Sequence, residues 1–313
     1  MKKIIVIILA LVMAFSLNAC AAKTETQPAA EQQVQATPEP TPVKIEITDM
    51  KGRTITLEKL PERIVSLSPS NTEILFALGA GSKVVGVTNY CTYPEEAAKL
   101  EKIGDFEGAN LELIKKAQPD IVFAGGYIQE DLVKSLEDLN ITVLSSEALD
   151  IKGIYDSIRM IAKATGTDAK AEEIIADMQS RIKAIEDKTK NKEKPKVFYV
   201  VWTDPLTTAG ADTFINDIIK AAGGINTAEK VSNWAKYSPE ELLKDNPEML
   251  IASNFCTPDG VSKEYFKNSP IFNKLECVKN DKIYMISSDD IFSRSGPRIV
   301  QAIEELAKLF HGI

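Results

Sequence analysis

The sequence predicts an α/β protein made of two similar lobes joined by one long helix, and three observations lead to this prediction. Residues 63–126 alternate strand-like apolar runs with polar loops and helical stretches. Residues 110–124 match residues 238–252 without a gap, at a constant offset of 128 residues, which indicates a repeated structural unit. Between the copies, a helical pattern over 168–190 would extend about 34 Å, the width of a small domain.

The first lobe is expected over residues 44–150. Residues 44–57 alternate apolar side chains around Asp49–Gly52, which predicts a small hairpin. In an open α/β sheet, ligands bind at the carboxyl ends of the strands. Four loops that follow or lie between the predicted elements should therefore form one rim of a binding site: Ser68–Asn71, Asn89–Tyr93, Gly104–Gly108 and Gly125–Tyr127.

Residues 151–194 are expected to form connecting helices, and residues 195–313 a second lobe. The helix over 168–190 either joins the lobes rigidly or packs on the first lobe, and both can hold together. In the second lobe, Ser238-Pro239 followed by Glu240-Glu241 predicts a capped helix start. Residues 204–210 are expected to be a loop, and residues 297–310 to form a final amphipathic helix.

The first 19 residues have the features of a secretory signal. Lys2 and Lys3 precede the apolar run Ile4–Leu17, which is too short for a comfortable membrane span. The run ends in Leu17-Asn18-Ala19-Cys20, which predicts lipidation of Cys20 with diacylglycerol and palmitate; the alternative is a plain signal peptide with a chance cysteine. Residues 20–43, rich in Pro, Gln and Ala, are expected to be a disordered tether.

Composition excludes several classes of function. The chain of 313 residues has a formal net charge of −8, which disfavours binding to nucleic-acid phosphates. Its single histidine, His311, lies near the C-terminus, so histidine-based catalytic triads and zinc sites are disfavoured. Phosphate-loop, dinucleotide and nucleophile-elbow motifs are lacking. We therefore expect no enzyme and no cofactor; a metabolic enzyme and a surface adhesin are the alternatives from other classes.

Two segments carry a family resemblance. Residues 65–87 (VSLSPSNTEILFALGAGSKVVGV), with the sequence that follows to residue 122, resemble the substrate-binding proteins of cobalamin and iron-chelate ABC importers. Residues 287–310 (SSDDIFSRSGPRIVQAIEELAKLF) resemble the C-terminal end of that family. The resemblance extends over about residues 44–313. It implies a class III substrate-binding protein: two Rossmann-like lobes, one rigid connecting helix, and a ligand held between the lobes.

The resemblance also implies ligand-binding residues. It suggests aromatic contacts at Tyr90, Phe106 and Trp234, with Asp290 and Arg294 in the last loop; Gly125 stands where the cobalamin binders have an aromatic residue. The predicted loops offer further aromatic side chains, namely Tyr127, Trp202, Phe255 and Phe292. Such a set suits a large, flat, mostly neutral ligand. Because acidic residues outnumber basic ones in these loops, a corrinoid is expected; a ferric hydroxamate siderophore or haem is the alternative.

The expected partners are an ABC permease with its ATPase subunits. Glu112 and Glu240 occupy equivalent positions in the two repeats, and in the resembled family glutamates at these positions meet permease arginines. A stabilising effect of each carboxylate on its own helix is the simpler explanation. The protein is expected to be a monomer that is lipid-anchored to the outer face of the cell membrane or to the periplasmic membrane surface.

Three cysteines follow Cys20, namely Cys91, Cys256 and Cys277. An exported location permits a disulfide. Cys256 and Cys277 belong to the same predicted lobe, so a bridge between them is expected, with Cys91 free at the rim of the cleft. The alternative is three reduced thiols.

Overall fold

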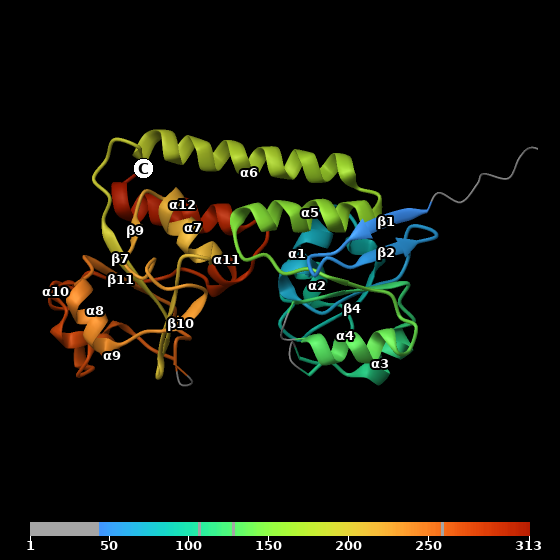
Figure 1. The fold of residues 1–313 in the computed structure, drawn as a ribbon, viewed down its shortest axis with the longest axis horizontal. Helices are drawn as coiled ribbons and strands as arrows, with labels where there is room; N and C mark the ends of the chain where they lie inside the picture. Colours follow the sequence, from blue (N-terminus) through green and yellow to red (C-terminus); the bar gives the residue numbers. More distant parts are fainter. Residues whose placement is uncertain (1–43, 106–107, 127–128, 258–259) are drawn as a thin grey trace, which may run out of the picture. The chain divides into compact units, whose positions relative to one another are not determined.

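The computed structural model describes residues 44–105, 108–126, 129–257 and 260–313. The described chain opens with the antiparallel hairpin of β1 (Ile45–Thr48) and β2 (Thr54–Leu57), as the alternation predicted. Two sheets follow, with helices packed around each (Figure 1). None of the helices in the described ranges combines the length and the hydropathy that a membrane span needs.

The sheet of the first lobe is parallel, with four strands in the order β4-β3-β5-β6. The strands are β3 (Ile64–Ser66), β4 (Val84–Val87), β5 (Ile121–Ala124) and β6 (Val143–Ser145). The helical segments are α1 (Pro69–Ala77), η1 (Gly81–Lys83), α2 (Glu95–Ala98), α3 (Leu111–Ala117) and α4 (Glu130–Glu137). Most of these strand residues are buried, as expected for a parallel sheet covered on both faces.

The second sheet is mixed, with six strands in the order β10-β8-β7-β11-β12 and β9 paired to β7. They are β7 (Lys196–Thr203), β8 (Leu206–Ala209), β9 (Ile225–Asn226), β10 (Trp234–Lys236), β11 (Met249–Ala252) and β12 (Ile283–Met285). The helical segments are α7 (Phe214–Ala221), α8 (Pro239–Asp245), α9 (Lys263–Asn268), η3 (Phe272–Lys274), α10 (Glu276–Lys279), α11 (Asp289–Ser293) and α12 (Ile299–His311).

The sequence repeat is also a structural repeat. Helix α3 with strand β5 in the first lobe corresponds to helix α8 with strand β11 in the second, residue for residue at the offset of 128. Asn110 and Ser238 cap the two helices through their side chains, and Gln118 and Asn246 end them in the left-handed conformation. The same start, length and stop in both copies confirm that the lobes share one unit.

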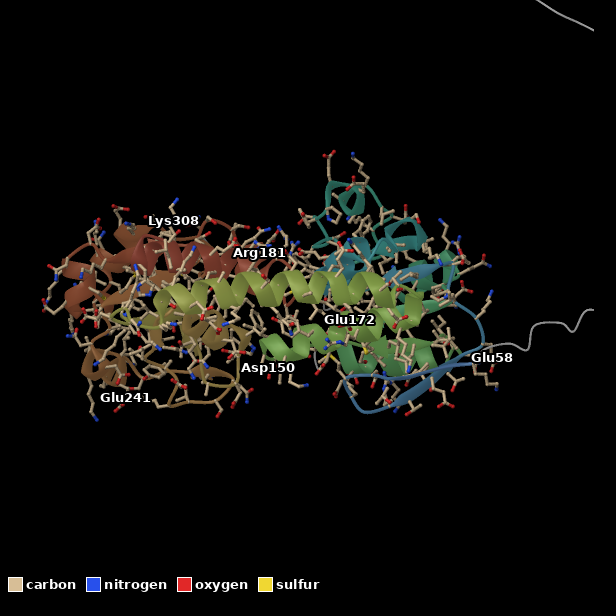
Figure 2. The ribbon with its side chains drawn as sticks, turned by 90° about the horizontal axis from the view of Figure 1, so that it is seen from above. Glu58, Asp150, Glu172, Arg181, Glu241 and Lys308 are labelled. Carbon is tan, nitrogen blue, oxygen red and sulfur yellow. The ribbon has the colours of Figure 1, made fainter. Side chains whose placement is uncertain are left out.

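The connection between the lobes consists of α5 (Ile151–Thr165) and α6 (Asp168–Thr189). Helix α6 packs on α5 and also on α7 and α12 of the second lobe (Figure 1). Its buried residues Ile175, Met178 and Ile182 belong to one apolar cluster that includes residues of both lobes. Figure 2 shows Glu172 and Arg181 along this helix, and Glu172 accepts a 2.7 Å hydrogen bond from Arg159 of α5. Both expectations for this helix therefore hold together.

One predicted loop is a strand. Residues 206–209 form β8, which pairs antiparallel with β7 and with β10. The turn before β8 contains the cis peptide bond between Asp204 and Pro205. The loop prediction was wrong because Asp204-Pro205 and Gly210 are typical turn residues and only four residues separate them. These four residues are a strand because they pair with β7 across the Asp204-Pro205 turn and with β10, which lies about 25 positions away.

Candidate functional site

A cleft of about 910 Å³ lies between the two lobes. The first lobe contributes the segments that follow β3, β4, β5 and β6, and the second contributes parts of β7 and β10 with the segments after β11 and β12. The carboxyl ends of the parallel strands therefore face the cleft, as the rule for open α/β sheets requires. The strand topology itself creates this site.

Aromatic side chains on the cleft surface differ sharply in exposure. Tyr90, Trp234 and Phe255 line the cleft with exposed fractions of 57%, 44% and 71%. Trp234 packs edge-on against the buried ring of Phe214, with centroids 5.5 Å apart. A second buried pair, Tyr199 and Phe292, stacks at 6.4 Å. Trp234, an exposed ring supported by a buried one, provides rigid apolar surface for a ligand, and Tyr90 and Phe255 add exposed aromatic surface.

The structure brings together six of the nine candidate ligand residues. The six that line the cleft are Tyr90, Trp234, Phe255, Asp290, Phe292 and Arg294. Phe106 and Tyr127 lie outside the described residues. Trp202 does not line the cleft; its indole nitrogen donates a 2.9 Å hydrogen bond to the carbonyl oxygen of Asp204. Trp202 lies near the end of β7, next to the turn, and is paired with Thr207 of β8.

Other cleft residues escaped sequence reasoning. Tyr199 lies inside β7 and Phe214 begins α7, so both have the pattern of ordinary core residues. Glu147 follows β6 and also lines the cleft. Burial, followed by the nearby charge of Asp289, raises the pKa of Tyr199 above its ordinary value.

The described cleft lining is acidic. It contains the carboxylates of Asp105, Glu147, Asp289 and Asp290 against one guanidinium, that of Arg294. Asp105 accepts a 2.6 Å hydrogen bond from the side-chain amide of Asn89. Arg294 forms a 2.7 Å ion pair with Asp290 and a 2.8 Å ion pair with Glu73. Its charge is therefore already matched by protein carboxylates, and the surface favours neutral or cationic ligands.

The predicted disulfide is absent. Cys256 and Cys277 are free and buried, as is Cys91. Cys256 follows β11, whereas Cys277 lies in α10, and both belong to one apolar cluster of the second lobe. Burial raises the pKa of each of these two thiols to about 11, so both persist as neutral thiols.

Cys91 is a free thiol, but it does not lie at the rim of the cleft. Its side chain is fully buried, and its sulfur accepts a 3.1 Å hydrogen bond from the Thr72 hydroxyl. Cys91 therefore helps to pack the loop after β4 against α1.

Glu112 and Glu240 lie in the first turns of α3 and α8, and both are exposed. Glu112 pairs with Lys115 at 3.2 Å. Glu240 accepts a 2.7 Å hydrogen bond from the Ser238 hydroxyl, and this bond lowers its pKa. Both carboxyl groups thus lie at equivalent, accessible positions of the two repeats.

Two α/β lobes with a ligand-sized cleft and a shared connecting helix define a two-lobed binding protein. Residues 64–289 match the periplasmic binding protein family, and the chain belongs to that family. It is 37% identical to an uncharacterized ABC transporter substrate-binding lipoprotein, YvrC, of Bacillus subtilis, over 84% of each chain. It is 32% identical to the vitamin B12-binding protein of Salmonella typhimurium, over 78% of this chain and 88% of that protein.

The fold is also similar to that of a solved structure, the periplasmic heme-binding protein RhuT from Roseiflexus in its apo form. The two share a TM-score of 0.72 and 27% sequence identity, over 80% of this chain and 98% of RhuT. The predicted architecture, a class III substrate-binding protein, is therefore confirmed.

Proposed function

We propose that the protein is the extracytoplasmic substrate-binding lipoprotein of an ABC importer that captures a corrinoid between its lobes and delivers it to a permease. The observation that carries the proposal is the cleft, with exposed aromatic rings on an acidic surface. Its volume of about 910 Å³ lies near the upper end of the range for ligand pockets, roughly 300–1,000 Å³. Such a cleft suits a large, flat ligand.

Charge distinguishes the corrinoid from other chelates. A catecholate siderophore is strongly anionic, and the two propionates of haem are carboxylates; both would meet the carboxylates of Asp105, Glu147 and Asp289. Like charges brought together in a site with little solvent are unfavourable. A corrinoid presents amide side chains and a cationic metal centre instead. A ferric hydroxamate chelate has little or no net negative charge and remains the main alternative ligand, with haem as another.

The ligand is expected to be transported cargo, and no resident cofactor is expected. A binding protein delivers its ligand chemically unchanged, whereas an enzyme would convert it. We expect cobalamin and cobinamide to bind one-to-one and saturably in calorimetric titrations of the purified protein. Ferric catecholates should not bind, because they are negatively charged and the surface of the cleft is also negatively charged. Tight binding of haem or a ferric hydroxamate with no binding of corrinoids would replace the proposed ligand, and chemical conversion of any of these would indicate an enzyme.

The membrane attachment is a separate part of the proposal. Residues 1–19 and Cys20 lie outside the described residues, and the anchor rests on their sequence and on the lipoprotein named among the similar proteins. Cys20→Ser should abolish incorporation of labelled palmitate and release the protein from the membrane fraction, because one thiol carries the diacylglycerol. A Cys20→Ser protein that still fractionates with membranes would contradict lipidation at this residue.

A further inference from the structure

A buried ion cluster joins the two lobes beside the cleft. Glu73 lies in α1 of the first lobe, and Asp290, Arg294 and Arg298 lie in or next to α11 and α12 of the second. Glu73 is 3% exposed and Arg294 is 9% exposed. Charged residues so deeply buried are rare unless they are paired, and here the pairing crosses between lobes.

The hydrogen bonds of Glu73 use both of its carboxylate oxygens. Oε1 accepts from Nη1 of Arg294 at 2.8 Å and from Nη2 of Arg298 at 2.6 Å, and Oε2 accepts from Nε of Arg298 at 2.8 Å. Asp290 supplies a second carboxylate, 2.7 Å from Arg294 and 3.5 Å from Arg298. The two carboxylates balance the two guanidinium groups, so removing one charge would leave another buried without its partner.

The same arginines hold a loop of the first lobe. Nη2 of Arg294 donates to the carbonyl oxygen of Tyr90 at 3.1 Å and to the Thr92 hydroxyl at 2.9 Å. The guanidinium of Arg298 lies 3.8 Å from the ring centroid of Tyr93. Tyr90, whose side chain is exposed in the cleft, is therefore held by its backbone from the opposite lobe.

Open space lies on both sides of the cluster. The ligand cleft lies on one side, lined by Asp290 and Arg294. A second cavity of about 740 Å³ lies on the other, lined by Glu73, Arg298 and Tyr93 together with residues of α6. Here the two lobes therefore meet through the ion cluster, which lies between two cavities. Because the neighbouring space is not filled by side chains, a change in the cluster can alter the distance between the lobes.

We propose that Glu73, Arg294 and Arg298 form an interlobe clamp that sets the width of the cleft and positions Tyr90 for the ligand. The predicted effect on ligand affinity rests on the proposed function, in which the cleft captures a ligand. The predicted effect on the distance between the lobes does not depend on that function. Glu73 lines the second cavity and not the cleft; it is a positioning residue that acts through the arginines.

The test uses the substitution Glu73→Gln, which keeps the shape of the side chain but removes its charge. Spin labels at Lys99→Cys and Lys244→Cys, whose parent side chains are 70% and 78% exposed on the two lobes, report the interlobe distance. The labelled protein carries Cys20→Ser, and Cys91, Cys256 and Cys277 are buried. We expect a broadened or shifted distance distribution without ligand. We also expect corrinoid affinity to fall by about tenfold to a hundredfold, as for loss of a buried charged hydrogen bond.

Glu304→Gln is the matched control. Glu304 forms a two-pronged pair with Arg181, both bonds 2.9 Å, away from the cleft, and this variant should keep the parent distances and affinity. Arg294→Lys is a second variant with its charge retained; one ammonium cannot reproduce the planar fork that reaches both lobes, so it should behave like Glu73→Gln.

Thermal melting of each variant confirms that it is folded. The clamp proposal would be overturned if folded Glu73→Gln and Arg294→Lys both kept the interlobe distances and the ligand affinity of the parent protein. It would also be overturned if the distances changed while the affinity stayed at the parent value. If the parent binds none of the tested chelates, the ligand proposal fails, while altered distances in the two variants still support the clamp.

Discussion

Replacing Tyr90→Ala and Trp234→Ala together should weaken corrinoid binding by at least a hundredfold. Both rings are exposed on the surface of the cleft, and Trp234 is supported by Phe214, with ring centroids 5.5 Å apart. A ligand that covers such rigid aromatic surface gains most of its affinity from a few contacts, and truncating one costs about 2 kcal/mol or more. Titration calorimetry of the double variant against cobalamin measures the loss.

The control for this prediction is Trp202→Phe. Trp202 was predicted as a ligand residue, but it is not among the residues that line the cleft, and its indole nitrogen donates to the carbonyl oxygen of Asp204 in the turn after β7. Trp202→Phe should therefore bind cobalamin with nearly the parent affinity. Loss of binding in Trp202→Phe, with binding retained in the double variant, would place the ligand elsewhere.

Removing both repeat glutamates, Glu112→Ala with Glu240→Ala, should abolish uptake while ligand binding stays at the parent value. Both carboxylates are exposed in the first turns of their helices, and neither residue lines the cleft. Exposed charges at an interface mainly guide association and fix register. The helices should remain folded, since the Asn110 and Ser238 caps are untouched. Uptake of labelled corrinoid by cells that express the variant, compared with binding by the purified protein, separates the two effects.

A matched double variant tests whether uptake depends on Glu112 and Glu240 in particular or on any exposed carboxylate in the first turn of a helix. Glu95 lies in the first turn of α2 in the first lobe and Glu264 in the first turn of α9 in the second. Glu264 accepts a hydrogen bond from Ser262, as Glu240 does from Ser238. Glu95→Ala with Glu264→Ala should support normal uptake. Equal uptake by both double variants would leave only the helix-dipole explanation for Glu112 and Glu240.

The parts of the fold that the sequence predicted well are those with local causes. Asn110 and Ser238 cap helices because their side-chain oxygens accept from backbone amides within the next three residues. Alternating apolar residues around a turn determined the first hairpin. The repeat offset extended this local information to the second lobe, since β5 and β11 occupy the same place in their units.

The parts of the fold and of the site that the sequence predicted less well depend on contacts between residues that are distant in the chain. Glu73 and Arg294 are 221 residues apart, and an acid in an apolar helix carries no local sign of its partner. Arg294 was predicted to contact ligand from the family resemblance; the structure shows that its guanidinium binds Glu73, the Tyr90 carbonyl and the Thr92 hydroxyl. Cys256 and Cys277 illustrate the same limit, because two cysteines in one lobe do not by themselves specify the geometry of a bridge.

A crystal structure of the protein with bound cobalamin tests the central claim most directly. We expect the corrin ring between the lobes, in contact with Tyr90 and Trp234, with the clamp of Glu73, Arg294 and Arg298 intact beside it. A corrinoid bound outside the cleft, or a cleft that remains empty in crystals grown with saturating cobalamin, would contradict the account.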